Sequence, residues 1–128
     1  MADVLIVEDE FLVALDLEDI IFQAGHGIIG VVADKRGIAE ISAAPKVALV
    51  DLNLRDGRTG PAIARELAER FGTKIIFVTA NPDQIESPPP TALGYIRKPF
   101  NHDDVLGALA LAMGTARAER PRGLHPLQ

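Results

Sequence analysis

Residues 4–9 read Val-Leu-Ile-Val-Glu-Asp, and residues 47–51 read Val-Ala-Leu-Val-Asp, so each apolar run ends in acidic side chains. Continuous runs of this length, rich in branched residues, are typical of strands buried on both faces of a parallel sheet. The carboxyl ends of parallel strands lie at one edge of the sheet, where open α/β sheets bind ligands. The sequence therefore predicts that Glu8, Asp9 and Asp51 lie together at that edge.

Two later apolar runs lead to a hydroxyl and an ammonium group. Lys74–Val78 is followed by Thr79, and Leu93–Ile96 is followed shortly by Lys98. Adjacent carboxylates repel one another unless a cation neutralises them, and oxygen ligands favour a hard ion such as magnesium. Three carboxylates, a hydroxyl and an ammonium at one edge indicate a magnesium-dependent phosphoryl site.

Apolar residues between these runs follow helical spacing. The pattern predicts helices over residues 10–24, 60–71 and 101–113, a short helix after Asp34, and a further strand over residues 28–32. Strands that alternate with helices are joined by right-handed crossovers and form a doubly wound sheet. We therefore predict an α/β fold with five parallel strands.

The length of the chain, 128 residues, suits a single domain. We assign residues 1–114 to that domain. Residues 115–128 are rich in arginine, proline and glycine, and we predict a disordered tail there. The chain contains no cysteine, which excludes disulfides and thiolate metal sites.

Charge and hydropathy restrict the classes of partner. The net charge is −5 with acidic and basic residues interleaved, so there is no electrostatic footprint for nucleic acid. The N-terminus carries no basic segment and the apolar runs are strand-sized. We therefore expect no signal peptide and no membrane span, a cytoplasmic location, and a protein as the binding partner.

The residues that follow these strands resemble the pocket of the receiver domain of bacterial two-component response regulators, and the resemblance spans residues 3–113. It implies the flavodoxin-like strand order 2-1-3-4-5. Residues 81–90 contain four prolines, so we expect the fourth helix of receivers to be shortened or disordered. This segment, the long turn over residues 54–60 and the motif at 98–100 are similar to stand-alone receivers associated with the alphaproteobacterial general stress response.

The resemblance also implies a role for each pocket residue. Asp51 is the expected phosphoacceptor, forming an acyl phosphate. Glu8, Asp9 and Asp51 are expected to hold Mg²⁺ together with the main-chain carbonyl of Asn53. Lys98 is expected to contact the phosphoryl oxygens.

Two further positions match the switch of receivers. The Thr79 hydroxyl is expected to move toward the phosphoryl group, and the Tyr95 ring to turn inward as it does. A cis peptide bond is expected between Lys98 and Pro99. His26, His102 and His125 fit no metal spacing, and we assign them no function.

These roles imply a single-domain response regulator of a phosphorelay. A sensor histidine kinase or a histidine phosphotransfer protein is the expected donor, and the output is contact with a downstream protein or competition for phosphoryl groups. We expect no direct contact with nucleic acid or membrane. Beyond slow hydrolysis of its own acyl phosphate, the domain is not expected to be an enzyme.

Alternative functions differ in what they require of the pocket. A dinucleotide-binding domain needs a glycine-rich turn where this chain has Glu8-Asp9-Glu10, which would repel pyrophosphate. A small phosphatase with Asp51 as nucleophile requires a substrate pocket for which the chain has little room. A pseudo-receiver that only binds a partner would not need every acceptor-pocket residue. Each residue also has a simpler interpretation when it is taken singly. An acidic pair after a strand is common at a helix N-terminus, and Lys98 could be a solvated surface charge.

Overall fold

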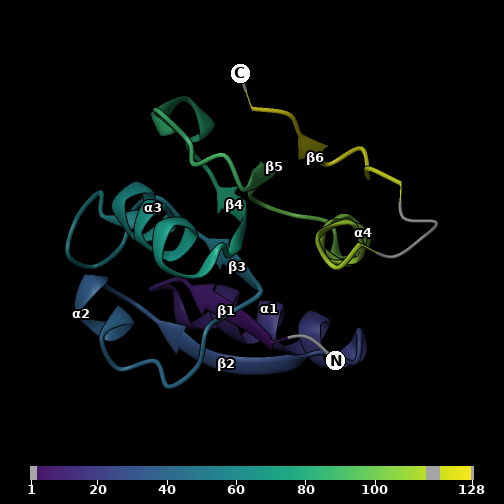
Figure 1. Cartoon of the computed structure of the whole chain (residues 1–128). Helices are drawn as coiled ribbons and strands as arrows, with labels where there is room; N and C mark the ends of the chain where they lie inside the picture. Colours follow the sequence, from purple (N-terminus) through teal and green to yellow (C-terminus); the bar gives the residue numbers. More distant parts are fainter. Residues whose placement is uncertain (1–2, 115–118, 128) are drawn as a thin grey trace.

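A central sheet of six strands organises the molecule (Figure 1). The computed structural model describes residues 3–114 and 119–127. The strand order is β2-β1-β3-β4-β5-β6; the first five strands are parallel, and β6 pairs antiparallel with β5. The predicted order 2-1-3-4-5 is confirmed. The strands are β1 (Asp3–Val7), β2 (Gly27–Val32), β3 (Val47–Val50), β4 (Lys74–Thr79), β5 (Ala92–Arg97) and β6 (Leu124–His125).

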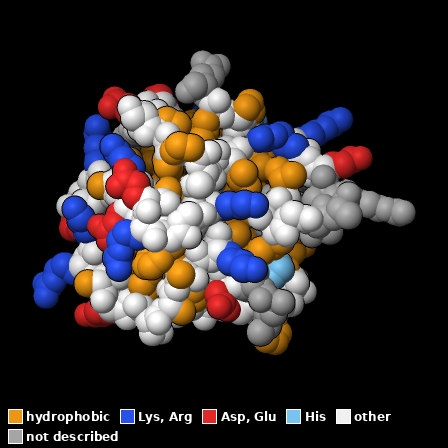
Figure 2. Space-filling view, viewed as in Figure 1, with side chains coloured by type: hydrophobic (Ala, Val, Ile, Leu, Met, Phe, Trp, Pro, Cys, Tyr) orange, Lys and Arg blue, Asp and Glu red, His pale blue; other side chains and the backbone are white. Residues whose placement is uncertain are grey.

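Helices cover both faces of the sheet, as a doubly wound fold requires. The helices are α1 (Phe11–Gln23), α2 (Lys35–Ile38), α3 (Gly60–Phe71) and α4 (His102–Ala112). Alternate residues along each strand enter two apolar clusters, one with α1 and α4 and the other with α2 and α3. None of the described helices is long and apolar enough to cross a bilayer. Figure 2 shows acidic and basic side chains interspersed over the face in view.

Local sequence explains where the helices begin and end. The Asp34 side chain accepts a hydrogen bond from the Gly37 N–H and caps α2, and Asn101 caps α4 in the same way through the Asp103 N–H. At the end of α3, Gly72 adopts a φ of 66°, the left-handed conformation that glycine tolerates best. These boundaries agree with the sequence patterns to within a few residues.

The connection between β4 and β5 contains no α-helix. Pro82–Gln84 forms a single 3₁₀ turn, η1, and the rest of the connection is irregular. Proline lacks the N–H that a helix interior requires, so the proline-rich sequence shortens the expected fourth helix. The Lys98–Pro99 bond that follows β5 is cis, as predicted.

The predicted disordered tail is wrong for residues 119–127, which lie against the sheet. Leu124 pairs with Ile96, and its side chain is 1% exposed within the apolar cluster under α4. The prediction rested on the polar and proline-rich composition of the tail. One buried leucine and pairing with the free edge of β5 are enough to order the segment in spite of that composition. In the described part of the chain the sheet therefore has six strands, not the predicted five. Residues 115–118 and 128, also assigned to the tail, lie outside the described part.

Gly60 brings the first turn of α3 against the strand end that carries Asp51. Its N–H donates to the Leu52 carbonyl at 3.1 Å. A Cβ at this position would collide with the Asp51 carbonyl and would lie 2.6 Å from Leu52 Cα. Glycine is therefore required by close backbone approach, and this contact positions α3 relative to Asp51.

We predict that Gly60→Ala lowers the free energy of unfolding by about 1–3 kcal/mol, because the added methyl group overpacks a site with no free space. Urea unfolding measures the loss. Gly30→Ala in β2 is the matched control, since no atom lies within 4 Å of its added Cβ. Equal losses in the two variants would contradict the assigned contact.

Candidate functional site

The acidic residues predicted to converge do lie together. Glu8 and Asp9 follow β1, Asp51 follows β3, and the two strands pair directly. One carboxylate oxygen from each of the three residues lies within 4.8 Å of the others. Glu8 and Asp51 are buried, whereas Asp9 is exposed. The cluster is therefore open to solvent on the side of Asp9.

Lys98 is the counter-ion of this acidic cluster. Its Nζ lies 2.6 Å from Glu8 Oε1, 2.9 Å from Asp51 Oδ2 and 3.4 Å from Glu10 Oε1. The Lys98 N–H donates to the Thr79 carbonyl at 2.9 Å, so the lysine backbone is held beside β4. Glu10 was not assigned to the site from sequence, although its position directly after Glu8-Asp9 was a usable signal.

Burial sets the protonation behaviour of the two innermost groups. Desolvation raises the pKa of Glu8 from 4.5 to about 7, although the Lys98 ammonium and the Glu10 N–H lower it. Burial alone would lower the pKa of Lys98, but the interactions with Glu8 and Asp51 outweigh it and raise that pKa. The lysine therefore remains charged and stabilises its carboxylate neighbours.

Backbone contacts hold the Asp51 carboxylate in a fixed orientation. The Leu52 N–H donates to Asp51 Oδ1 at 2.7 Å, while Oδ2 faces Lys98. The Asp51 N–H donates to the Val7 carbonyl at 2.9 Å, which ties the residue to β1. Both carboxylate oxygens of Asp51 thus have defined partners at the carboxyl edge of the sheet.

The two residues predicted as a switch lie on neighbouring strands. Thr79 is buried at the end of β4, and its Oγ1 accepts a hydrogen bond from the Asn81 N–H at 2.9 Å. Tyr95 on β5 is half-buried, and its ring stacks on His125 with centroids 5.0 Å apart. No sequence pattern assigned His125 a role, because its contact with Tyr95 depends on β6, which was not predicted.

The long turn after Asp51 is ordered by polar contacts to α2. Leu54 and Gly57 exchange two backbone hydrogen bonds that close the turn. Arg55 forms an ion pair with Asp34 at 2.7 Å, and Asp56 accepts from the Lys35 N–H at 3.1 Å. The hydrogen bond from Arg55 is the main cause that lowers the pKa of Asp34. A hydrogen bond from the Thr59 hydroxyl is the main cause that lowers the pKa of Asp56.

The cluster fits a hard divalent cation. All three side chains offer oxygen, the donor that Mg²⁺ prefers. Glu8 Oε1 is buried without a well-aligned hydrogen bond, although Lys98 lies beside it. A cation among Glu8, Asp9 and Asp51 would offset their mutual repulsion. Asn53, whose carbonyl is the further ligand expected from the resemblance, is half-buried two residues after Asp51.

Known proteins match this chain in sequence and structure. It is 35% identical to the phyllosphere-induced regulator PhyR of Methylorubrum extorquens over 129 residues, covering 96% of this chain and 48% of PhyR. The solution structure of the Erythrobacter litoralis PhyR receiver domain has a TM-score of 0.76 at 29% identity and covers 94% of this chain and 95% of that one.

A crystal structure of the anti-anti-sigma factor PhyR from Bartonella quintana has a TM-score of 0.74 at 29% identity and covers 88% of this chain and 47% of that one. The chain spans about half the length of the curated relatives it matches. The model of the response regulator receiver domain matches residues 4–110. Together with the strand order and the acidic site, this match shows that the chain belongs to the response regulator receiver domain family.

Proposed function

We propose that this receiver accepts a phosphoryl group on Asp51 from a histidine kinase or a histidine phosphotransfer protein, with Mg²⁺, and signals by contact with another protein. The observation that carries the proposal is the cluster of Glu8, Asp9 and Asp51 with Lys98 at its centre. Phosphoryl transfer needs mainly positioning and charge neutralisation, and these groups supply both.

In the proposed reaction an Asp51 carboxylate oxygen attacks the phosphorus of a phosphohistidine. A P–O bond forms, the P–N bond breaks, and the bond electrons remain with the histidine nitrogen, which takes up a proton. Mg²⁺ bound by Glu8, Asp9, Asp51 and the Asn53 carbonyl would neutralise charge on the phosphoryl oxygens. The Leu52 N–H keeps Asp51 Oδ1 oriented.

Lys98 and Thr79 act on the phosphoryl group after transfer. The ammonium of Lys98, now shared among carboxylates, would pair with a phosphoryl oxygen as a point charge. The Thr79 hydroxyl would turn from the Asn81 N–H toward another phosphoryl oxygen. Release of the group by water would be slow, so the domain acts as a signalling module and not as an enzyme.

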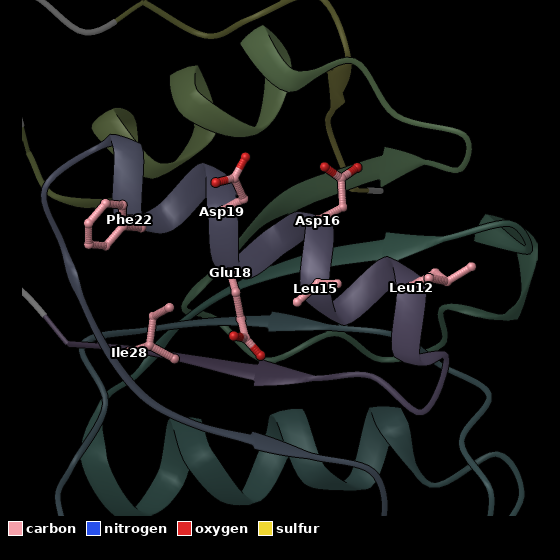
Figure 3. Close-up of a pocket in the computed structure, with 7 residues that line it drawn as sticks. All are labelled: Leu12, Leu15, Asp16, Glu18, Asp19, Phe22 and Ile28. Carbon is pink, nitrogen blue, oxygen red and sulfur yellow. The ribbon is translucent and has the colours of Figure 1, made fainter.

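The face of α1 beside the site is suited to the phosphodonor protein. Leu12 and Phe22 are each 77% exposed and Leu15 is 49% exposed. Together with Asp16, Glu18, Asp19 and Ile28, these side chains line an open groove of about 600 Å³. Figure 3 shows the apolar and acidic side chains that α1 contributes to this groove spaced along the helix. Leu12 also lines the hollow that contains Lys98, so the apolar face continues to the phosphoryl site.

The relatives support a protein output. The Bartonella quintana PhyR is an anti-anti-sigma factor by name, and this name supports an output through contact with proteins. We propose the same general form of output, contact with another protein, for this chain.

We predict that incubation with phosphoramidate and Mg²⁺ adds one phosphoryl group to the protein, because a small donor needs only the acceptor pocket. Intact-mass spectrometry detects the adduct. Asp51→Asn should abolish it, and Asp3→Asn, an exposed acid at the start of β1, should not. An adduct that persists in Asp51→Asn would refute the acceptor assignment.

Without divalent metal, we predict that the free energy of unfolding falls as pH rises from about 5 to 8. The folded-state pKa of Glu8 is raised to about 7, so its contribution is complete below the unfolded value near 4.5 and is lost as pH passes 7. Urea unfolding as a function of pH measures this slope. Glu8→Gln should flatten this slope, whereas Glu69→Gln, at an exposed position of α3, should leave it unchanged. A slope retained in Glu8→Gln would contradict the assignment.

For the α1 face we predict that Leu15→Asp slows phosphoryl transfer from a phosphorylated histidine donor protein about tenfold or more, through lost apolar contact. Labelling by phosphoramidate should be unchanged. Ala62→Asp places the same charge at an exposed position of α3 and is the control. Equal transfer rates for the wild type and Leu15→Asp would exclude this face as the donor contact.

A further inference from the structure

Residues 119–127, here called the strap, close the edge of β5. His125 pairs with Tyr95 and Leu124 with Ile96 in an antiparallel ladder. The Arg120 guanidinium donates to the Leu93 carbonyl at 3.0 Å and to the Leu124 carbonyl at 3.3 Å. The strap is therefore held by a buried side chain, backbone pairing and a charged clamp.

Three glycines make room where the strap meets the domain. A Cβ at Gly94, whose φ is 152°, would collide with the His125 carbonyl. A Cβ at Gly107 would lie 3.1 Å from Pro121, and one at Gly123 would collide with the Asp104 carboxylate. Missing side chains on both sides of the contact indicate an interface with specific packing.

The strap also forms one wall of a cleft above Tyr95. The cleft has a volume of about 380 Å³, and its opposite wall is the proline-rich connection, including Pro82, Asp83 and Ile85. Leu127 lines it from the side of the strap. The Tyr95 ring, stacked on His125, thus lies between the strap and that connection.

A hydrogen bond links this cleft to the phosphoryl site. Thr79 Oγ1 accepts from the Asn81 N–H, and Asn81 immediately precedes the 3₁₀ turn that contributes to the cleft wall. If the hydroxyl turns toward Asp51, this bond is lost and the 3₁₀ turn loses one of its links to β4. If the Tyr95 ring turns inward as Thr79 moves, the movement predicted from the resemblance, the ring must leave its stack on His125.

We propose that the strap is an autoinhibitory element: its docking on β5 and Tyr95 opposes the phosphorylated arrangement of the site. This inference rests on the proposed phosphorylation of Asp51. Because coupling between two sites is reciprocal, phosphorylation weakens strap docking, and weakening the strap favours the phosphorylated arrangement.

The test measures binding of beryllofluoride with Mg²⁺, a stable mimic of the phosphoryl group, by the full chain. His125→Ala removes the stacked ring and leaves Leu124 buried. We expect it to bind beryllofluoride about two- to tenfold more tightly than the wild type, the range expected for loss of one aromatic stack. Gly123→Ala, which disturbs strap docking near Asp104, should change affinity in the same direction. Arg122→Ala, exposed in the same segment, is the control and should match the wild type.

Amide hydrogen exchange gives a second readout on the same samples. Beryllofluoride should accelerate exchange at Leu124 and His125 in the wild type. Binding that depends on Asp51, with unchanged affinity in both strap variants and unchanged exchange, would overturn the strap's role alone. Absence of beryllofluoride binding by the wild type would overturn the proposed phosphorylation together with the regulation that depends on it.

Discussion

The ion pairs of Lys98 with Glu8 and Asp51 are the interaction on which the site depends. They join the ends of three strands, β5, β1 and β3, and they place one positive charge among buried acids. Burying a carboxylate costs free energy unless the carboxylate is paired. The pKa of Glu8 is raised because the ion pair with Lys98 offsets only part of this desolvation cost. The remaining negative charge is what makes the edge attractive to a divalent cation.

Much of this site could be predicted because parallel topology converts sequence position into spatial position. A polar residue that directly follows a buried apolar run must emerge at the carboxyl edge of the sheet, whatever the helices between do. This reasoning places Glu8, Asp9, Asp51 and Thr79 correctly without knowledge of any contact. The strand order needed the family resemblance, since periodicity does not state which strands are neighbours.

The features that sequence reasoning missed depend on long-range backbone contacts. β6 has only two residues, too few for a period to be recognised, and its order comes from Leu124 and the edge of β5. The sequence pattern at Gly60 is that of an ordinary helix start. It does not show the close approach of α3 to Asp51, because that approach depends on tertiary packing. The partnership of Tyr95 with His125 likewise exists only when β6 is in place.

The position of β6 also determines which backbone edge remains open to other molecules. Within the described residues the sheet ends at β2 on one side and at β6 on the other (Figure 1). Unpaired strand edges are templates for association between chains. While β6 is docked, the β5 edge is withdrawn from such pairing at Tyr95 and Ile96, and β2, with Val31 42% exposed, is the longer free edge. Aggregation at high protein concentration would then begin at β2, on the opposite side of the sheet from the cleft.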